Sequence, residues 1–137
     1  GLNPFLLQGN TKDNLLINAK RLMVDGKPNP GAWIYTPSYE RFHCADPAWV
    51  QVDVGKLMRI GSVTVWHYWG GAPRQYCGER IAVSETGYFN GEEIELHTTG
   101  LDFGQDSTGD GLTVSARGVT GRYIRHWAAG STANTGI

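Results

Sequence analysis

The sequence predicts an all-β protein, an antiparallel β-sandwich, and three observations support this prediction. The 137-residue chain contains 19 glycines, charged residues make up only 18% of it, and short apolar–polar alternations recur between turn signals. About seven short strands at such spacing are typical of an antiparallel sandwich. A chain of this length can bury about two thirds of its unfolded surface. We therefore expect one domain with a substantial core, spanning residues 1–137.

The individual strands are predicted from alternation and from the turn residues that separate the runs. Val50, Val52 and Val54 share one face, which indicates a half-buried strand, and Gly55 is expected to turn the chain before Ile60. The seven predicted segments are residues 32–36, 48–55, 60–69, 80–87, 93–99, 111–115 and 121–130. In residues 13–26 apolar side chains come close to helical spacing, so a helix competes there with strand and loop.

The charge and hydropathy of the chain exclude several classes of partner. Its 12 basic and 13 acidic residues give a net charge of −1, which creates no field that would attract nucleic acid or an anionic membrane. No apolar run approaches the roughly 20 residues of a membrane span, and the first residues lack the pattern of a signal peptide. We expect a soluble domain, either mature or excised from a longer protein.

The most informative stretch is residues 63–84, where an alternating strand ends in four ring-bearing residues. Successive strand side chains face opposite ways, so at least two of the rings between Trp66 and Trp69 must lie at a surface. The loop that follows carries Arg74, and Arg80 comes soon after it. Aromatic rings beside arginine guanidinium groups, which donate hydrogen bonds in pairs, suit a ligand with apolar faces and many hydroxyl groups. A sugar is such a ligand.

Strand direction predicts where the candidate ligand contacts gather. If residues 49–54, 62–69 and 80–84 run antiparallel in turn, the start of the first segment, the end of the second and the start of the third lie at one end of the sandwich. We expect a pyranose face to stack there on Trp69 or Tyr76, while hydroxyl groups bond to His67 and Arg74. The other candidates are Arg41 and His43 in a long loop, and Ser131, Thr132 and Asn134 in a small polar loop.

Other charged or ring-bearing side chains receive structural roles at this stage. His97 and His126 are interpreted as ordinary strand residues. Arg80 adjoins Glu79 at the start of a strand, and a surface ion pair, worth little energy, is the preferred interpretation. Asp102, Asp106 and Asp110 are spaced by four, which is typical of a solvated hairpin loop rather than of a calcium-binding helix-loop-helix.

Cys44 and Cys77 are the two cysteines of the chain, and the strand argument places both at the same end of the sandwich. We expect them to form a disulfide, which would stabilise the fold by roughly 3.5 kcal/mol on the chain-entropy model and hold two loops of the site. Such a bond would place the protein in an oxidising compartment. Two buried free thiols are the alternative, because spacing alone proves no pairing.

Four pieces of the chain, in order, resemble the discoidin-type domain, also called the coagulation factor type C domain. They are LMVDGKPNPGAWIYTP at 22–37, AWVQVDVGKLMRIGSVTVW at 48–66, ERIAVSETGYFNGEEI at 79–94 and GRYIRHWAAGSTANTG at 121–136. Family 32 carbohydrate-binding modules share this domain. The resemblance implies a galactose-binding-domain-like jelly roll whose loops at one end hold a ligand, often a sugar, on a secreted bacterial enzyme. Such domains continue into a closing strand with a glutamate, which this chain lacks after residues 134–137.

The resemblance also implies a structural calcium site. Asp25 would supply the side-chain ligand, and backbone carbonyls around Lys27 and Asn29 would complete an oxygen cage for one Ca²⁺. A plain Asp-Gly turn at Asp25 explains the same residues.

No catalytic constellation is evident, since the sequence shows neither a nucleophile beside a base nor a zinc spacing or phosphate loop. His43 and Cys44 are adjacent, but strand-like neighbours point apart. We therefore expect a noncatalytic carbohydrate-binding module of a secreted or cell-surface multidomain protein. The alternatives are an adhesion module that binds a cell-surface protein, lipid or glycan, and a fucose-type lectin, whose usual histidine and two arginines are only loosely echoed by residues 74–80.

Overall fold

The computed structural model describes residues 7–9, 44, 48–67 and 73–132, and within them the chain forms β-strands and connecting loops. The strands are β1 (Leu7–Gly9), β2 (Ala48–Val65), β3 (Tyr76–Cys77), β4 (Arg80–Ser84), β5 (Ile94–Thr98), β6 (Leu112–Ala128) and β7 (Gly130–Ser131). Among these residues no helix is long and apolar enough to cross a membrane.

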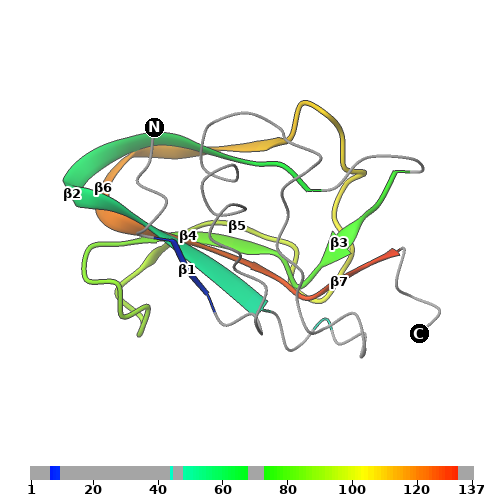
Figure 1. Cartoon of the computed structure of the whole chain (residues 1–137), viewed down its shortest axis with the longest axis horizontal. Coiled ribbons are helices and arrows are strands. Elements are labelled where there is room, and N and C mark those ends of the chain that lie inside the picture. The colour runs from blue at the N-terminus through cyan, green and yellow to red at the C-terminus, as the bar shows by residue number, and fades with distance from the viewer. Residues whose placement is uncertain (1–6, 10–43, 45–47, 68–72, 133–137) are drawn as a thin grey trace.

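The strands form two antiparallel sheets. Five of them make one sheet in the order β1-β2-β6-β4-β5, and β3 pairs with β7 in a separate two-stranded sheet. The long strands β2 and β6 form a ribbon that curls over at one end of the molecule, so that its two halves lie in opposite layers (Figure 1). The small β3–β7 sheet lies at the other end. This layered antiparallel arrangement confirms the predicted β-sandwich.

The bend of the ribbon corrects the predicted strand boundaries. Gly55 does not end a strand, because β2 continues through it to Val65 with a shift in register between Asp53 and Met58. Gly55 has φ 94°, and Arg117 and Gly118, at a second register shift opposite Gly61, have φ 55° and 68°. These left-handed conformations fold the ribbon without interrupting its pairing. Residues 48–55 and 60–65 of two predicted segments therefore belong to the single strand β2, and residues 112–115 and 121–128 of two others belong to β6.

The core lies between the two halves of the folded ribbon. Ile60 and Ala116 come from the returning halves of β2 and β6, and they meet Val83 of β4. Half-buried apolar side chains complete this cluster: Val63, Leu96, Val119 and Ile124. A Cβ atom on Gly121 would lie 2.0 Å from Cγ1 of Val83, so only glycine fits at that position. The core thus ties β4 to both halves of the ribbon.

The two faces of the first half of β2 are both covered. Val50, Val52 and Val54 are half-buried as predicted, but Gln51 on the other face is buried as well. Arg125 of β6 donates to Oε1 of Gln51 from Nε and Nη2 at 3.0 and 2.7 Å. The predictions for residues 13–26 and 32–36 lie outside the described residues.

Candidate functional site

The predicted gathering of loops at one end of the sandwich is confirmed. Ala48 at the start of β2 pairs with Ala128 at the end of β6, and Arg80 at the start of β4 pairs with Trp127. Because the ribbon folds back, His67 after the far end of β2 also returns to this end, where its side chain contacts that of Glu79. Three segments distant in sequence therefore meet beside β3 and β7.

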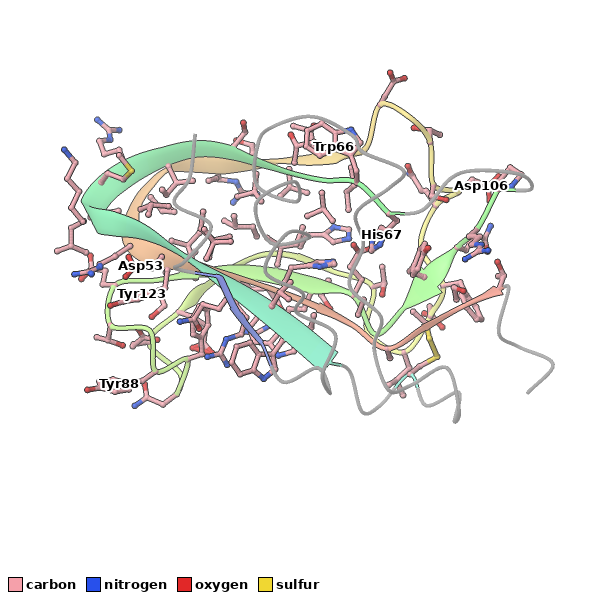
Figure 2. All side chains as sticks on the ribbon, in the orientation of Figure 1. Asp53, Trp66, His67, Tyr88, Asp106 and Tyr123 are labelled. Carbon is pink, nitrogen blue, oxygen red and sulfur yellow. A yellow bond between two sulfur atoms is a disulfide. The ribbon has the colours of Figure 1, made fainter. Side chains whose placement is uncertain are left out.

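The segment before β3 and the segment after β7 lie side by side. Tyr76 pairs with Ser131 in the two-stranded sheet. The Gln75 amide donates to Oγ1 of Thr132 at 3.1 Å, and the Thr132 amide donates to the Gln75 carbonyl at 2.9 Å. The Arg74 amide donates to Oγ of Ser107 at 3.2 Å. Residues 74–77 and 130–132 thus form a hydrogen-bonded rim, on a side of the molecule far from Tyr88 (Figure 2).

The rim is fixed by the predicted disulfide, which the structure contains between Cys44 and Cys77. Cys77 is fully buried, and its carbonyl accepts a hydrogen bond from the Ala129 amide at 2.9 Å. The alternative of two free thiols is excluded. The bond joins a loop residue near the start of β2 to the centre of the small sheet, as the sequence argument expected.

Five of the predicted ligand contacts fall within the described residues: His67, Arg74, Tyr76, Ser131 and Thr132. The rings of His67 and Tyr76 stack with centroids 3.9 Å apart and an interplanar angle of 15°. Tyr76 and Arg74 are half-buried. Ser131 is only 3% exposed, so its hydroxyl group lies beneath the rim rather than on it. The structure thus connects His67 and Ser131 to Tyr76, with Arg74 two residues before it, and the role of these residues in binding a sugar stays a prediction.

The remaining predicted site residues lie outside the described residues. They are Arg41, His43, Trp69 and Asn134 of the sugar site, and Asp25, Lys27 and Asn29 of the calcium site. Their roles stay predictions from the sequence.

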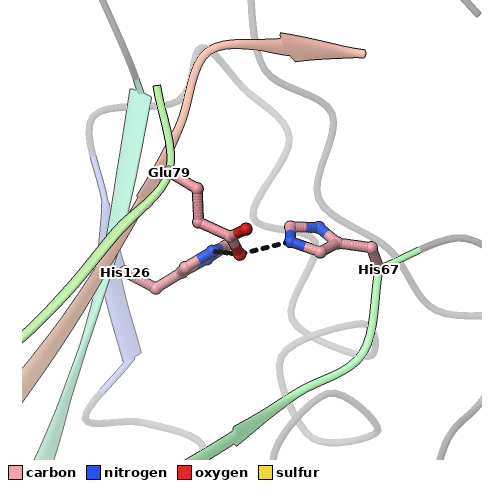
Figure 3. A group of neighbouring side chains, drawn as sticks. All are labelled: His67, Glu79 and His126. Carbon is pink, nitrogen blue, oxygen red and sulfur yellow. Dashed lines mark hydrogen bonds and ion pairs between the residues drawn. The ribbon is translucent and has the colours of Figure 1, made fainter. Parts of the chain in front are cut away.

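Next to Tyr76, three half-buried histidines surround the buried Glu79 (Figure 3 shows His67, Glu79 and His126). Oε1 of Glu79 lies 2.5 Å from Nε2 of His67 and 3.0 Å from Nε2 of His126. Nε2 of His97 lies 3.8 Å from Oε2 of Glu79, and this buried nitrogen has no hydrogen-bond partner among the described residues. We call these four residues the histidine–glutamate cluster.

Strand register explains why the cluster forms. His97, Ile81 and His126 are cross-strand partners on β5, β4 and β6, so they share one face of the sheet. Glu79 precedes Ile81 by two residues and faces the same way, with a histidine diagonal to it on either side. His67 reaches this face from the opposite layer.

The cluster perturbs the ionisation of its members. Burial alone would raise the pKa of Glu79, but hydrogen bonds from His126 and His67 outweigh it and hold that pKa far below its ordinary value of 4.5. Burial also lowers the pKa of His126 from 6.5, although its hydrogen bond to Glu79 opposes the shift. Glu79 is therefore an ionised carboxylate that is held by hydrogen bonds within the cluster.

Sequence reasoning missed this cluster. His97 and His126 are not ordinary strand residues, because both side chains face Glu79. Glu79 does not join a surface ion pair with Arg80, which instead binds Glu95 at 2.8 Å and Glu93 at 3.5 Å across the neighbouring strand. The sequence did contain one indication of the cluster. Glu79 lies two residues before the apolar Ile81, so in a strand both side chains face the same way, and this predicts an acidic side chain on a buried face.

Comparisons with known proteins support the discoidin-type fold. The CBM32 of AlyQ in complex with 4,5-unsaturated mannuronic acid matches with a TM-score of 0.66 and 16% identity, covering 98% of this chain and 88% of that one. The module CpGH89CBM32-5 from Clostridium perfringens, in complex with GalNAc-β-1,3-galactose, matches with a TM-score of 0.62 and 14% identity, covering 97% and 91%.

A larger protein, truncated AlyQ with CBM32 and alginate lyase domains, matches with a TM-score of 0.61 and 18% identity, covering 94% of this chain and 28% of that one. No family model matches the chain, and a search of curated proteins finds no match. At these identities the similarity establishes the fold: the chain has the β-sandwich of family 32 carbohydrate-binding modules.

Proposed function

We propose that this protein is a noncatalytic carbohydrate-binding module that holds its ligand at the rim formed by residues 74–77 and 130–132. One observation carries the proposal: Tyr76 stacks on His67 and shares a half-buried rim segment with Arg74, at the loop end of a fold found in sugar-binding modules. Aromatic surface and a guanidinium side by side suit a pyranose, because the ring face packs on one while hydroxyl or carboxylate groups bond to the other.

Each rim residue has a distinct role in this proposal. Tyr76, braced by the stacked ring of His67, offers aromatic surface, and Arg74 donates hydrogen bonds to sugar oxygens. Trp69 and Asn134 are proposed as further contacts on the sequence evidence alone. Groups that bond hydroxyls in fixed positions would reject an epimer that leaves them unpaired.

The chemistry of Glu79 favours binding over catalysis. A glycosidase needs a carboxylic acid that can give a proton to the leaving oxygen. Glu79 has its pKa held far below the ordinary value, and its carboxylate is 5% exposed and bonded to two imidazoles. An ionised, engaged carboxylate is a poor general acid near neutral pH.

The disulfide and the comparisons support a proposal for the compartment of the protein and for the domains that accompany this one. Stable disulfides form in oxidising compartments, which favours a secreted or cell-surface protein. Truncated AlyQ joins a module of this fold to an alginate lyase domain. We therefore place this chain beside a glycan-active enzyme domain in a larger secreted protein.

A glycan array tests the proposal, with neutral and amino sugars, GalNAc-β-1,3-galactose and uronic acid oligomers as probes. The wild type is compared with Tyr76→Ala, Arg74→Ala and Trp69→Ala, and each variant is checked for folding by near-ultraviolet circular dichroism. Tyr88→Ala is the matched control, because Tyr88 is 76% exposed on the far side of the molecule. We expect Tyr76→Ala, Arg74→Ala and Trp69→Ala each to lose at least about tenfold in affinity, roughly the 1–3 kcal/mol of an aromatic or charged contact, and the control to lose none.

The possible results separate the proposal from its alternatives. Binding that is abolished by Tyr88→Ala but survives the rim variants would move the site to the other end of the sandwich. The absence of binding to any glycan would contradict the carbohydrate function and favour an adhesion module for protein or lipid.

A further inference from the structure

We propose that the histidine–glutamate cluster is a binding site for one divalent transition-metal ion, with Zn²⁺ as the best match. His67, Glu79 and His126 are the proposed ligands, and His97 is the fourth. This site differs in residues and in ligand chemistry from the calcium site predicted around Asp25, and it goes beyond the proposed sugar binding.

The spacing of the donor atoms suits a single ion. The ligand atoms of His67, Glu79 and His126 all lie within 4.8 Å of one another. Around tetrahedral zinc, with ligand distances of about 2.0–2.2 Å, neighbouring donors are about 3.3 Å apart. Side-chain adjustments on the order of 1 Å would therefore place all three donors around an ion. On binding zinc through Nε2, a neutral imidazole that now donates from Nε2 to the carboxylate would carry its proton on Nδ1 instead, and only a doubly protonated ring would release a proton to solvent.

The donor types point to a transition metal rather than to calcium. Neutral imidazole nitrogen suits zinc, copper and nickel, whereas calcium selects sites built from oxygen. Two or three imidazoles with one carboxylate resemble the mixed nitrogen and oxygen sets that hold zinc. The carboxylate also gains from the ion, because a buried negative charge is stable only when it is paired or bound to a metal.

The backbone around Glu79 is held in place by hydrogen bonds and by the disulfide. The Glu79 amide donates to Oγ1 of Thr99 at 3.1 Å, and the Thr99 amide donates to the Glu79 carbonyl at 2.9 Å. Cys77, two residues before Glu79, is tied by the disulfide to Cys44. A site whose ligands are positioned before the ion arrives loses little conformational entropy on binding it.

His97 supplies an independent observation. Its buried Nε2 makes no hydrogen bond among the described residues, although it lies only 3.8 Å from Oε2 of Glu79. A buried polar atom without a partner costs free energy, and such atoms in native proteins call for an explanation. A metal ion bound to Glu79 would give this nitrogen a partner and would complete four-coordination.

The test is a ZnCl₂ titration of tag-free, EDTA-dialysed protein by isothermal calorimetry, with the metal content measured by mass spectrometry. We expect one zinc ion per chain with a dissociation constant in the micromolar range or tighter, and no competition from CaCl₂. Glu79→Gln and His126→Gln should each weaken binding at least about tenfold, in line with the loss of one ligand or its supporting contact. Glu95→Gln is the matched control, because Glu95 lies on β5, the strand that carries His97, but binds Arg80 instead of the cluster. This substitution should leave the zinc affinity unchanged.

A second measurement decides the question if the cluster variants fail to fold. The imidazole ¹⁵N resonances of wild-type protein are recorded with and without zinc, and those of His67, His97 and His126 should shift together at one equivalent. No zinc binding by the wild type, shifts confined to His43, or equal loss in Glu95→Gln would overturn the proposal. Glycan binding measured in EDTA is a separate result, so failure of the metal site and failure of the sugar site can be told apart.

Discussion

Gly78 shows how closely the backbone is packed at the end of the sandwich that carries the candidate site. It has φ +64°, and a Cβ atom placed on it would lie 2.4 Å from the Cys44 carbonyl oxygen and 2.9 Å from Cβ of Ala129. Gly78→Ala therefore combines backbone strain with a clash against main-chain atoms. We expect it to lower the free energy of unfolding by about 2–3 kcal/mol in urea denaturation.

Gly61 is the matched control for this substitution. A Cβ atom at Gly61 meets nothing within 4 Å, and the residue has no positive φ. Gly61→Ala should therefore change the free energy of unfolding by less than about 1 kcal/mol. Equal effects of the two substitutions would show that packing around Gly78 is looser than the structure indicates.

A second prediction at the residue scale concerns Asp53. Nε and Nη2 of Arg122 donate to its two carboxylate oxygens at 2.8 and 2.9 Å, and these bonds hold the Asp53 pKa below its ordinary 3.8. Because the folded-state pKa is lower than the unfolded one, the pair stabilises the protein above pH 3.8. This contribution disappears as the pH falls through the lower, folded-state value.

The variant Asp53→Asn tests the direction of this pH dependence. Urea denaturation at a series of pH values should show a deficit in stability near neutral pH that shrinks as the solution is acidified. Asp102→Asn, at an exposed loop position, serves as the control and should show no such trend. A deficit that stays constant at all pH values would mean that Asp53 acts through packing rather than through its charge.

Residue types indicated part of the site but not its buried half. The rings and arginine of residues 66–76 pointed to a binding end, and the structure brings His67, Arg74 and Tyr76 together there. The histidine–glutamate cluster escaped detection because it depends on pairing register, which single-residue patterns do not contain. His97 and His126 are 29 positions apart in sequence, and only the alignment of β5, β4 and β6 brings both beside Glu79.

At the scale of elements, the disulfide connects the loop before β2 to the small β3–β7 sheet. Cys44 and Cys77 are separated by 33 positions, and closing a loop of that length should contribute about 3.5 kcal/mol through restriction of the unfolded chain. Cys44→Ser with Cys77→Ser should lower the free energy of unfolding by about that amount and weaken glycan binding at the rim. Unfolding of the wild type with and without a reducing agent provides the check, and an unchanged urea midpoint would contradict it.

The folded ribbon explains why the sequence predicted more strands than the structure has in this region. Gly55 and the Arg117–Gly118 pair carry left-handed backbone, which in sequence looks like a turn between two strands. In the structure the two bends lie at different register shifts, with Gly55 between Asp53 and Met58 and the Arg117–Gly118 pair opposite Gly61, and β2 and β6 resume their pairing after each of them. Alternation alone cannot distinguish a turn that ends a strand from a bend through which the strand continues.

At the scale of the whole molecule, the fold class could be predicted from the sequence because it depends on composition and on repeated alternation. Neither of these changes when the boundaries of single strands are predicted wrongly. β4 and β5 lie within predicted segments, and the antiparallel sandwich is confirmed. That residues 1–137 form a single domain stays a prediction.

The net charge of −1 predicts that ligand association is not electrostatically steered. The affinity for a neutral glycan, measured by calorimetry, should therefore change little between low and physiological salt.

The size of the rim limits the affinity that one copy of the module can reach. A shallow site that contacts a single sugar residue through a few side chains should bind in the micromolar to millimolar range. A tandem fusion of two copies converts the second contact into an intramolecular one, which should raise the apparent affinity for a long polysaccharide by about 10²–10⁴. The linker must span a folded module, whose radius of gyration is about 14 Å for this length.

Two comparisons make the tandem fusion a test of the site. A fusion in which one copy carries Tyr76→Ala should return to the affinity of the single module, because its second rim no longer binds. An oligosaccharide too short to reach both rims should bind the intact fusion no more tightly per site than it binds the single module. If the mutated fusion kept the full gain, the added affinity would come from a surface other than the rim, and the placement of the sugar site at Arg74 and Tyr76 would be wrong.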